Sequence, residues 1–138
     1  MVGISLALFV YAASPVKQED KFTEFYNHSD IYIEAVKNPL SFKESLKQYT
    51  REQAVILGVS PDLAFCLINA ESGWRYTAKN RYSSAYGLGQ FLNSTWYRTE
   101  QRMDVELDRY NPYDQLDAFL WLLKTDGYRH WIVWPMCT

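Results

Sequence analysis

The stretch PDLAFCLINAESGW, residues 61–74, decides the fold of this chain. The serine before it can cap the N-terminus of a helix, the proline suits a first turn, and an acid follows at the positive helix end. The body, LAFCLINA, is apolar almost all round, which indicates burial on several sides rather than one wet face. The sequence therefore predicts a buried helix that runs to about Ser72, with Glu71 in its last turn.

Glu71 is the most informative residue of this stretch, because two effects favour its protonated form. Burial removes the solvation of the charge, and the negative end of the helix repels it. A glutamate whose pKa lies near neutrality is what protonation of a leaving glycosidic oxygen requires. The alternative is a helix-terminal glutamate that points into water, and this local pattern favours neither of the two.

Three further helices are predicted from similar signals. A capping box at residues 41–44, SFKE, predicts a helix start there, and Gly58 supplies a left-handed stop. Asparagine, serine and threonine at residues 93–95 can cap another helix. The Asn-Pro pair at residues 111–112 opens the last one, in which apolar residues share one face until Gly127 ends it.

The segment between the second and third of these helices, residues 73–89, has a different composition. Its Tyr, Ser, Asn, Lys and Gly residues make a poor core but favour loops and short strands, so we predict that it forms a cleft wall. The tail at residues 128–134 carries two tryptophans and is expected to fold back onto the helical body. Aromatic residues, 17% of the chain, either fill cores or stack on flat ligands such as sugar rings.

The overall composition indicates one globular domain and excludes some partners. A chain of 138 residues with 48% hydrophobic residues is long enough to bury its own core. A net charge of −2 gives no field that would gather nucleic acid or anionic lipid. We expect a monomer that binds no nucleic acid, has no stable membrane span and needs no metal ion or other cofactor.

The N-terminal part is expected to precede the folded domain. Residues 1–13 form an apolar run as long as the core of a signal peptide and too short to span a bilayer. No Lys or Arg precedes this run, so a buried N-terminal helix or a truncated start is the alternative. Residues 14–40 are interpreted as a polar lead-in with one helix near residues 31–36, and residues 41–138 as the domain.

The two cysteines, Cys66 and Cys137, suit an oxidising compartment if they meet in space. Cys66 lies in an apolar segment, where a free buried thiol is at least as common as a bridge. Both histidines, His28 and His130, lie apart from the cysteines in sequence, which argues against a metal site.

Several linked motifs resemble the soluble lytic transglycosylase (SLT) domain of the lysozyme-like superfamily. These are AESGW at residues 70–74, YGLGQF at residues 86–91 and STW at residues 94–96, followed by Asn-Pro at residues 111–112 and Gln115. The resemblance covers roughly residues 57–134. It implies an α+β fold that is predominantly α-helical and lysozyme-like, with a small β-hairpin beside the cleft.

The resemblance also implies a site and a reaction. Glu71 would be the catalytic acid and base for cleavage of peptidoglycan between N-acetylmuramic acid and N-acetylglucosamine, with a 1,6-anhydro product. The expected substrate-binding residues are Ser72, Tyr86, Gly87, Leu88, Gln90 and Tyr128. Action would be extracytoplasmic, in the periplasm, the cell envelope or a secreted form, or from a phage virion.

The chain departs from the family pattern at two places. Gly89 stands where the family usually has methionine, which is expected to loosen or widen a subsite. The Ala-Tyr-Asn motif found late in the family is absent, so either Tyr128 or Tyr86 would have to support Glu71.

Three alternatives stay open at this point. A hydrolytic muramidase of the same fold would use a second acid such as Asp104 or Asp126 to position water. A non-catalytic glycan-binding component of a virion or envelope would keep the groove without turnover. A helical protein in which Glu71 serves only the fold is the third.

Overall fold

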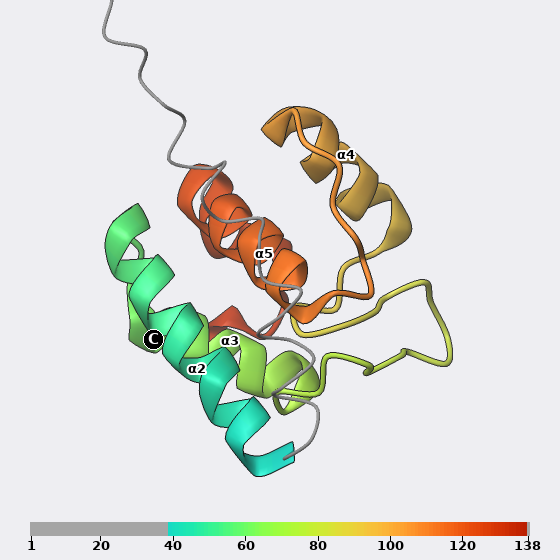
Figure 1. Cartoon of the computed structure of the whole chain (residues 1–138). Coiled ribbons are helices and arrows are strands. Elements are labelled where there is room, and N and C mark those ends of the chain that lie inside the picture. The colour runs from blue at the N-terminus through green and yellow to red at the C-terminus, as the bar shows by residue number, and fades with distance from the viewer. Residues whose placement is uncertain (1–38, 138) are drawn as a thin grey trace, which may run out of the picture.

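The computed structural model describes residues 39–137 (Figure 1). Four α-helices make up most of this part of the chain: α2 (Pro39–Leu57), α3 (Pro61–Ser72), α4 (Asn93–Met103) and α5 (Pro112–Asp126). Two short 3-10 helices follow, η2 (Gly127–His130) and η3 (Trp134–Met136). The predicted signal segment, the helix near residues 31–36 and most of the polar lead-in lie outside the described residues.

The core lies where α5 packs against its neighbours. Helix α2 contacts both α3 and α5, and α4 packs on the other side of α5 (Figure 1). Helix α5 lies at the centre of this packing, and ten of its residues are buried. The largest fully buried apolar side chains are Leu46, Leu67, Ile68, Leu88, Leu116, Phe119, Leu120 and Leu122. Burial of each of these side chains stabilises the fold by about 1.5–3 kcal/mol relative to exposure. They belong to one cluster of buried residues, so the packed helices share one core.

The caps predicted for α3 and α5 are confirmed. Ser60 Oγ accepts a hydrogen bond from Leu63 N at 3.3 Å at the start of α3, and Gly73 ends this helix with φ +60°. Asn111 Oδ1 accepts from Tyr113 N at 2.9 Å ahead of α5. Local side-chain capping therefore sets the bounds of both helices.

The N-terminal caps predicted for α2 and α4 are wrong, whereas the predicted stop at Gly58 is confirmed, because this residue follows Leu57 with φ +71°. Helix α2 begins at Pro39, ahead of the predicted N-cap at Ser41, because proline is well suited to the first turn. Helix α4 has Leu92 as its N-cap and no side-chain capping bond. The Asn93 side chain instead accepts a hydrogen bond from Arg109 Nη1, so it is not available to cap its own helix.

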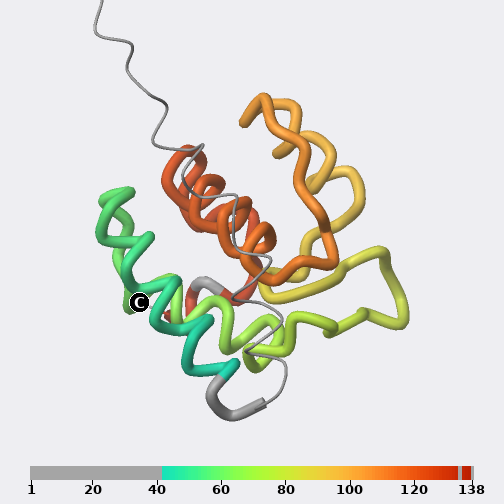
Figure 2. The backbone as a smooth tube through the Cα atoms, viewed as in Figure 1, coloured from blue at the N-terminus to red at the C-terminus, as the bar shows by residue number. Residues whose placement is uncertain are grey.

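The segment between α3 and α4 extends away from the helical body (Figure 2). Two isolated β-bridges form in it, Lys79 with Tyr86 and Tyr86 with Phe91. Within residues 39–137 no β-strand forms, so the predicted small hairpin is not confirmed, whereas the predominantly helical fold is.

The C-terminal tail folds back onto the body, as predicted. Trp131 is buried, and its Nε1 donates a hydrogen bond to Gly89 O at 3.0 Å. Cys66 in α3 and Cys137 form a disulfide across 71 residues of sequence. Closing a loop of this length stabilises the fold by about 4 kcal/mol in the chain-entropy treatment. In the described part of the chain, no helix combines the length and apolarity that crossing a bilayer requires.

Candidate active site

Glu71 lies in the last turn of α3, one residue before the end of the helix. Its carboxyl group is half-buried, and burial raises its pKa above the ordinary value. The adjoining negative end of α3 disfavours the charged form as well. Glu71 thus lies at the end of α3 as predicted, and its pKa shifts in the predicted direction. The expected burial of this helix on several sides is wrong, because its buried residues, Ala64, Leu67, Ile68 and Ser72, lie along one face.

No described side chain forms a hydrogen bond or ion pair with the Glu71 carboxyl group, so no neighbouring group opposes the effect of burial on its pKa. Support of Glu71 by Tyr86 or Tyr128 stays a prediction. An acid that is partly desolvated and unpaired is free to exchange its proton with a bound ligand. Glu71 therefore has the environment that a general acid needs.

Ser72 supports the end of the helix from within. The residue is buried, and its Oγ donates to Ile68 O at 3.1 Å. Its backbone oxygen accepts from Arg75 Nε at 3.1 Å. In this conformation Ser72 fixes the turn that follows Glu71, and little of its surface is left to contact a ligand.

Gln115 holds the loop that contains the GLGQ motif. It is 1% exposed, and its Oε1 accepts from Leu88 N at 2.8 Å. Its Nε2 donates to Tyr76 O at 3.0 Å and to Arg109 O at 2.8 Å. One buried amide on α5 therefore joins three backbone segments, which positions the loop relative to the helical core.

Gly87 and Leu88 lie against the Gln115 side chain and are buried. Gly87 has φ +83°, and a Cβ atom there would lie 2.6 Å from Gln115 Cδ. Only glycine allows both the backbone conformation and the close approach of the amide. Leu88 is 0% exposed and belongs to the core. Both residues are buried and shape the loop, and a direct contact with a saccharide stays a prediction.

The loosened subsite expected at Gly89 is wrong. A Cβ atom at Gly89 would lie 2.8 Å from Phe119 Cδ2 and 3.0 Å from Phe91 Cε2. Two aromatic rings therefore occupy the space that a side chain at Gly89 would need. The Gly89 backbone oxygen accepts a hydrogen bond from the Trp131 indole. The glycine is matched to this aromatic packing and opens no cavity.

Of the predicted substrate-binding residues in this loop, Tyr86 and Gln90 keep part of their surface exposed. Gln90 adopts φ +50°, and its Nε2 donates to Ala78 O at 3.0 Å and to Gly87 O at 2.9 Å. Tyr86 forms backbone hydrogen bonds with Phe91 in both directions at 3.1 Å, and burial raises the pKa of its phenol. Both side chains are thus fixed by the backbone of the loop.

Tyr128 lies in η2, outside this loop. Its side chain is exposed, and its backbone oxygen accepts from Trp131 N at 2.9 Å. The structure therefore places Tyr128 on the segment that leads from α5 into the buried tryptophan.

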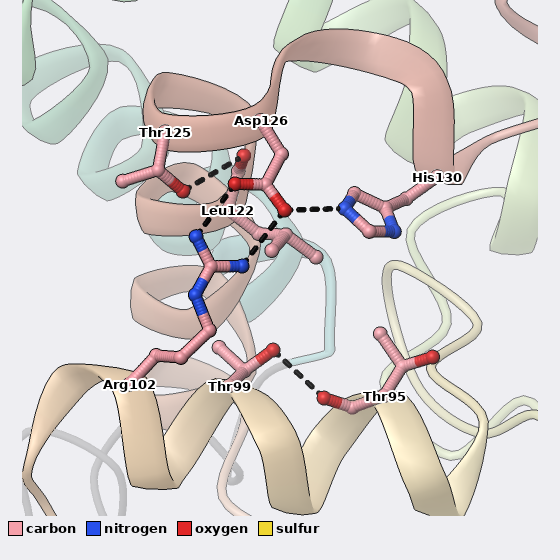
Figure 3. A network of polar contacts seen from close by, with 7 residues as sticks. All are labelled: Thr95, Thr99, Arg102, Leu122, Thr125, Asp126 and His130. Atoms are coloured by element: carbon pink, nitrogen blue, oxygen red, sulfur yellow. Dashed lines mark hydrogen bonds and ion pairs between the residues drawn. The ribbon is translucent and has the colours of Figure 1, made fainter.

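The two acids considered for a hydrolytic mechanism are placed differently from Glu71. Asp126 Oδ1 lies 2.7 Å from Arg102 Nη2, and its Oδ2 lies 2.8 Å from both Arg102 Nη1 and His130 Nε2 (Figure 3). These partners hold the pKa of Asp126 well below its usual range. Asp104 is exposed and follows α4, whose C-terminal end lies across the molecule from the end of α3 (Figure 1). Neither acid is arranged to act opposite Glu71.

A third acid, Asp117, was not found by sequence reasoning. Its carboxyl group is buried between α5 and α2, and its Oδ1 accepts from Tyr49 Oη at 2.6 Å. Burial raises its pKa to about 7, while the Tyr49 hydrogen bond opposes the shift. Asp117 lies in the core, so the raised pKa reflects the cost of burying charge and not access to a substrate.

Among residues 39–137, no group of three or more His, Cys, Asp and Glu side chains is placed to hold a metal ion. The candidate residues with accessible surface are the half-buried Glu71 at the end of α3 and the partly exposed Tyr86 and Gln90 in the loop that follows.

Comparison with known families gives a match over most of the described chain. The family model described as "Transglycosylase SLT domain" matches residues 48–128, which include all four helices in whole or in part. Searches of curated proteins and of solved structures returned no significant match.

Proposed function

Because the chain belongs to the transglycosylase SLT domain family, whose chemistry is cleavage of peptidoglycan glycan strands, we propose that Glu71 is its general acid and base. The bond cleaved is the β-1,4 linkage between N-acetylmuramic acid and N-acetylglucosamine. The observation that carries this proposal is the half-buried Glu71 carboxyl group, which has a raised pKa and no partner among the described residues.

The reaction proceeds in two proton transfers at one carboxyl group. Protonated Glu71 donates its proton to the glycosidic oxygen, the bond from this oxygen to the anomeric carbon breaks, and positive charge develops on the muramic acid ring. The Glu71 carboxylate then accepts the proton of the 6-hydroxyl group of the same ring, and the 6-oxygen bonds to the anomeric carbon. Atoms balance without water, and the product carries a 1,6-anhydro ring.

The placement of Asp104 and Asp126, the two acids considered for hydrolysis, supports this route. Two carboxyl groups on opposite sides of the bond are the usual arrangement in hydrolases. Asp126 is paired with Arg102 and His130, and Asp104 is remote from the end of α3. An internal hydroxyl group held close to the anomeric carbon competes effectively with solvent, so one acid is sufficient.

The proposed contacts with the glycan strand come from the exposed parts of the loop. Gln90 retains an amide oxygen to accept from sugar hydroxyl or acetamido groups, and Tyr86 offers an aromatic face. Tyr128 remains a proposed contact on η2, while Ser72, Gly87 and Leu88 act by shaping the backbone. Peptidoglycan lies outside the cytoplasmic membrane, and the Cys66–Cys137 disulfide fits an oxidising compartment, so action there is proposed.

Product mass tests the proposal. Purified sacculi are digested with the wild-type chain, and the released fragments are analysed by mass spectrometry. We expect fragments that are one water lighter than hydrolysis products and that lack a reducing end. Fragments with only reducing ends would establish the muramidase alternative, and binding to sacculi without release of fragments would establish the non-catalytic one.

A further inference from the structure

A pocket lies between the Tyr86 loop, the start of α4 and the segment that joins α4 to α5. This pocket has a volume of about 280 Å³ and is lined by Lys79, Ser84, Tyr86, Asn93, Arg109 and Tyr110. Small-molecule pockets usually measure about 300–1,000 Å³, so this one suits a small end group and not a stretch of polysaccharide.

The pocket carries positive charge that no described acid neutralises. Arg109 Nη2 donates to Ser84 O at 2.7 Å and also to Phe91 O, and Nη1 donates to Asn93 Oδ1. These oxygens belong to amides, not carboxylates, and burial lowers the pKa of the guanidinium. Lys79 lies exposed at the same pocket and, within residues 39–137, has no ion-pair partner. An anion entering the pocket would therefore meet two cations.

Two tyrosines complete the pocket. The Tyr86 and Tyr110 rings pack edge to face with centroids 5.4 Å apart, and the Arg109 guanidinium lies 5.7 Å from the Tyr86 ring centroid. Asp108, in the segment between α4 and α5, accepts a hydrogen bond from Tyr110 N at 2.9 Å through Oδ1, and its charge contributes to the raised pKa of Tyr86. Aromatic faces, phenol donors and cations together favour a short organic carboxylate over an inorganic ion.

We propose that this pocket binds a carboxylate of the peptide stem that branches from muramic acid in peptidoglycan. The inference rests on the proposed function, because Tyr86 belongs both to the pocket and to the proposed saccharide contacts. The glycan backbone offers no free carboxylate where the lactyl group is joined to peptide, whereas the stem carries several. The pocket therefore makes the enzyme prefer strands that keep their stems.

Rates on two substrates test the preference. Glycan strands with stems and the same strands stripped of stems by an amidase are digested in parallel, and the ratio of the two kcat/KM values is measured. We expect a ratio above one for the wild-type chain and a decrease of about two- to fivefold in Lys79→Met, the size of one solvent-exposed ion pair. Lys124→Met is the matched control, because this exposed lysine lies on α5 outside the pocket, and it should keep the wild-type ratio.

A binding measurement separates failure of this inference from failure of the proposed function. A synthetic stem peptide is titrated into Glu71→Gln, which needs no turnover, and NMR shifts of the pocket residues are followed. Binding that is lost when the peptide carboxylates are amidated, and weakened in a Glu71→Gln/Lys79→Met double variant, supports the inference even if no strand is cleaved. Equal binding of free and amidated peptides, or no binding, would overturn it, as would equal wild-type rates on both strands.

Discussion

Glu71 and Asp126 each lie in the last turn of a helix that a glycine follows, so the negative end of a helix faces both carboxyl groups. Their pKa values nevertheless shift in opposite directions. Glu71 is half-buried without a partner, and desolvation raises its pKa. Asp126 is bound by Arg102 and His130, which lower its pKa. The surrounding partners, and not the place in the helix, decide which acid can exchange a proton.

Asp117 extends this comparison, because burial raises its pKa as it does that of Glu71, but Asp117 lies in the core of the protein. Its carboxyl group is enclosed between α2 and α5 and bonded to Tyr49. A raised pKa therefore indicates a functional acid only where the group can also reach a ligand. The predictions below test these three acids in turn.

The largest effect is expected from a matched pair of variants, Glu71→Gln and Asp126→Asn. Loss of general acid–base catalysis reduces rates by about 10²–10⁴-fold, so Glu71→Gln should lower the rate of sacculus lysis by at least 10²-fold. Asp126→Asn should retain nearly the wild-type rate at a temperature where it is folded. Similar decreases of the lysis rate in both variants would contradict the proposal that Glu71, and not Asp126, exchanges the proton.

Asp117→Asn is expected to change the dependence of stability on pH. The folded-state pKa is raised from 3.8 to about 7, so the wild-type chain loses stability as pH rises from about 4 through 7. The change is on the order of 4 kcal/mol at 1.36 kcal/mol per pKa unit. Urea unfolding of Asp117→Asn between pH 4 and pH 8 should lack this loss, whereas the exposed control Asp104→Asn should retain it.

The pH dependence of activity is the next largest effect. Because Glu71 must be protonated to donate to the glycosidic oxygen, kcat/KM should fall about tenfold per pH unit above the raised pKa. The same descending limb should appear in Asp126→Asn. A limb that moves in Asp126→Asn, or activity that rises with pH over this range, would assign the titration to another group.

The smallest effect is expected for stability in Asp126→Asn. Its folded pKa is depressed, so its contribution is present above the unfolded pKa of about 4 and is lost as pH falls below it. Exposed ion pairs are worth about 0.2–1 kcal/mol each, so this variant should lose about 1 kcal/mol of unfolding free energy at pH 7. Thermal unfolding at pH 7 and at pH 3 measures the loss, which should shrink at the lower pH.

Local signals in the sequence were sufficient for part of the fold. The bounds of α3 and α5 follow from their caps and glycines, because these interactions join residues a few positions apart. The start of α4 could not be found in this way, since Arg109 engages Asn93 from 16 residues away. The disulfide spans 71 residues, so its formation depends on the tertiary fold.

The sequence also predicted only part of what the structure shows around the candidate site. Glu71 follows from its place at the end of an apolar helix, but the role of Gly89 depends on Phe119, which lies in a different helix. The Gln115 junction and the buried Asp117 are hidden in the sequence, because both polar residues lie within the apolar face of α5. Only packing shows which polar groups are enclosed and what they contact.

The link between Cys66 and Cys137 encloses the whole loop between α3 and α4 in a covalent ring. Residues 79–84 of that loop are all exposed and lie within the ring. A protease that cuts one peptide bond there produces two pieces that remain joined, so the nicked chain migrates as a single species until a thiol reductant separates the fragments. A backbone break in this exposed segment therefore leaves both halves of the chain covalently joined.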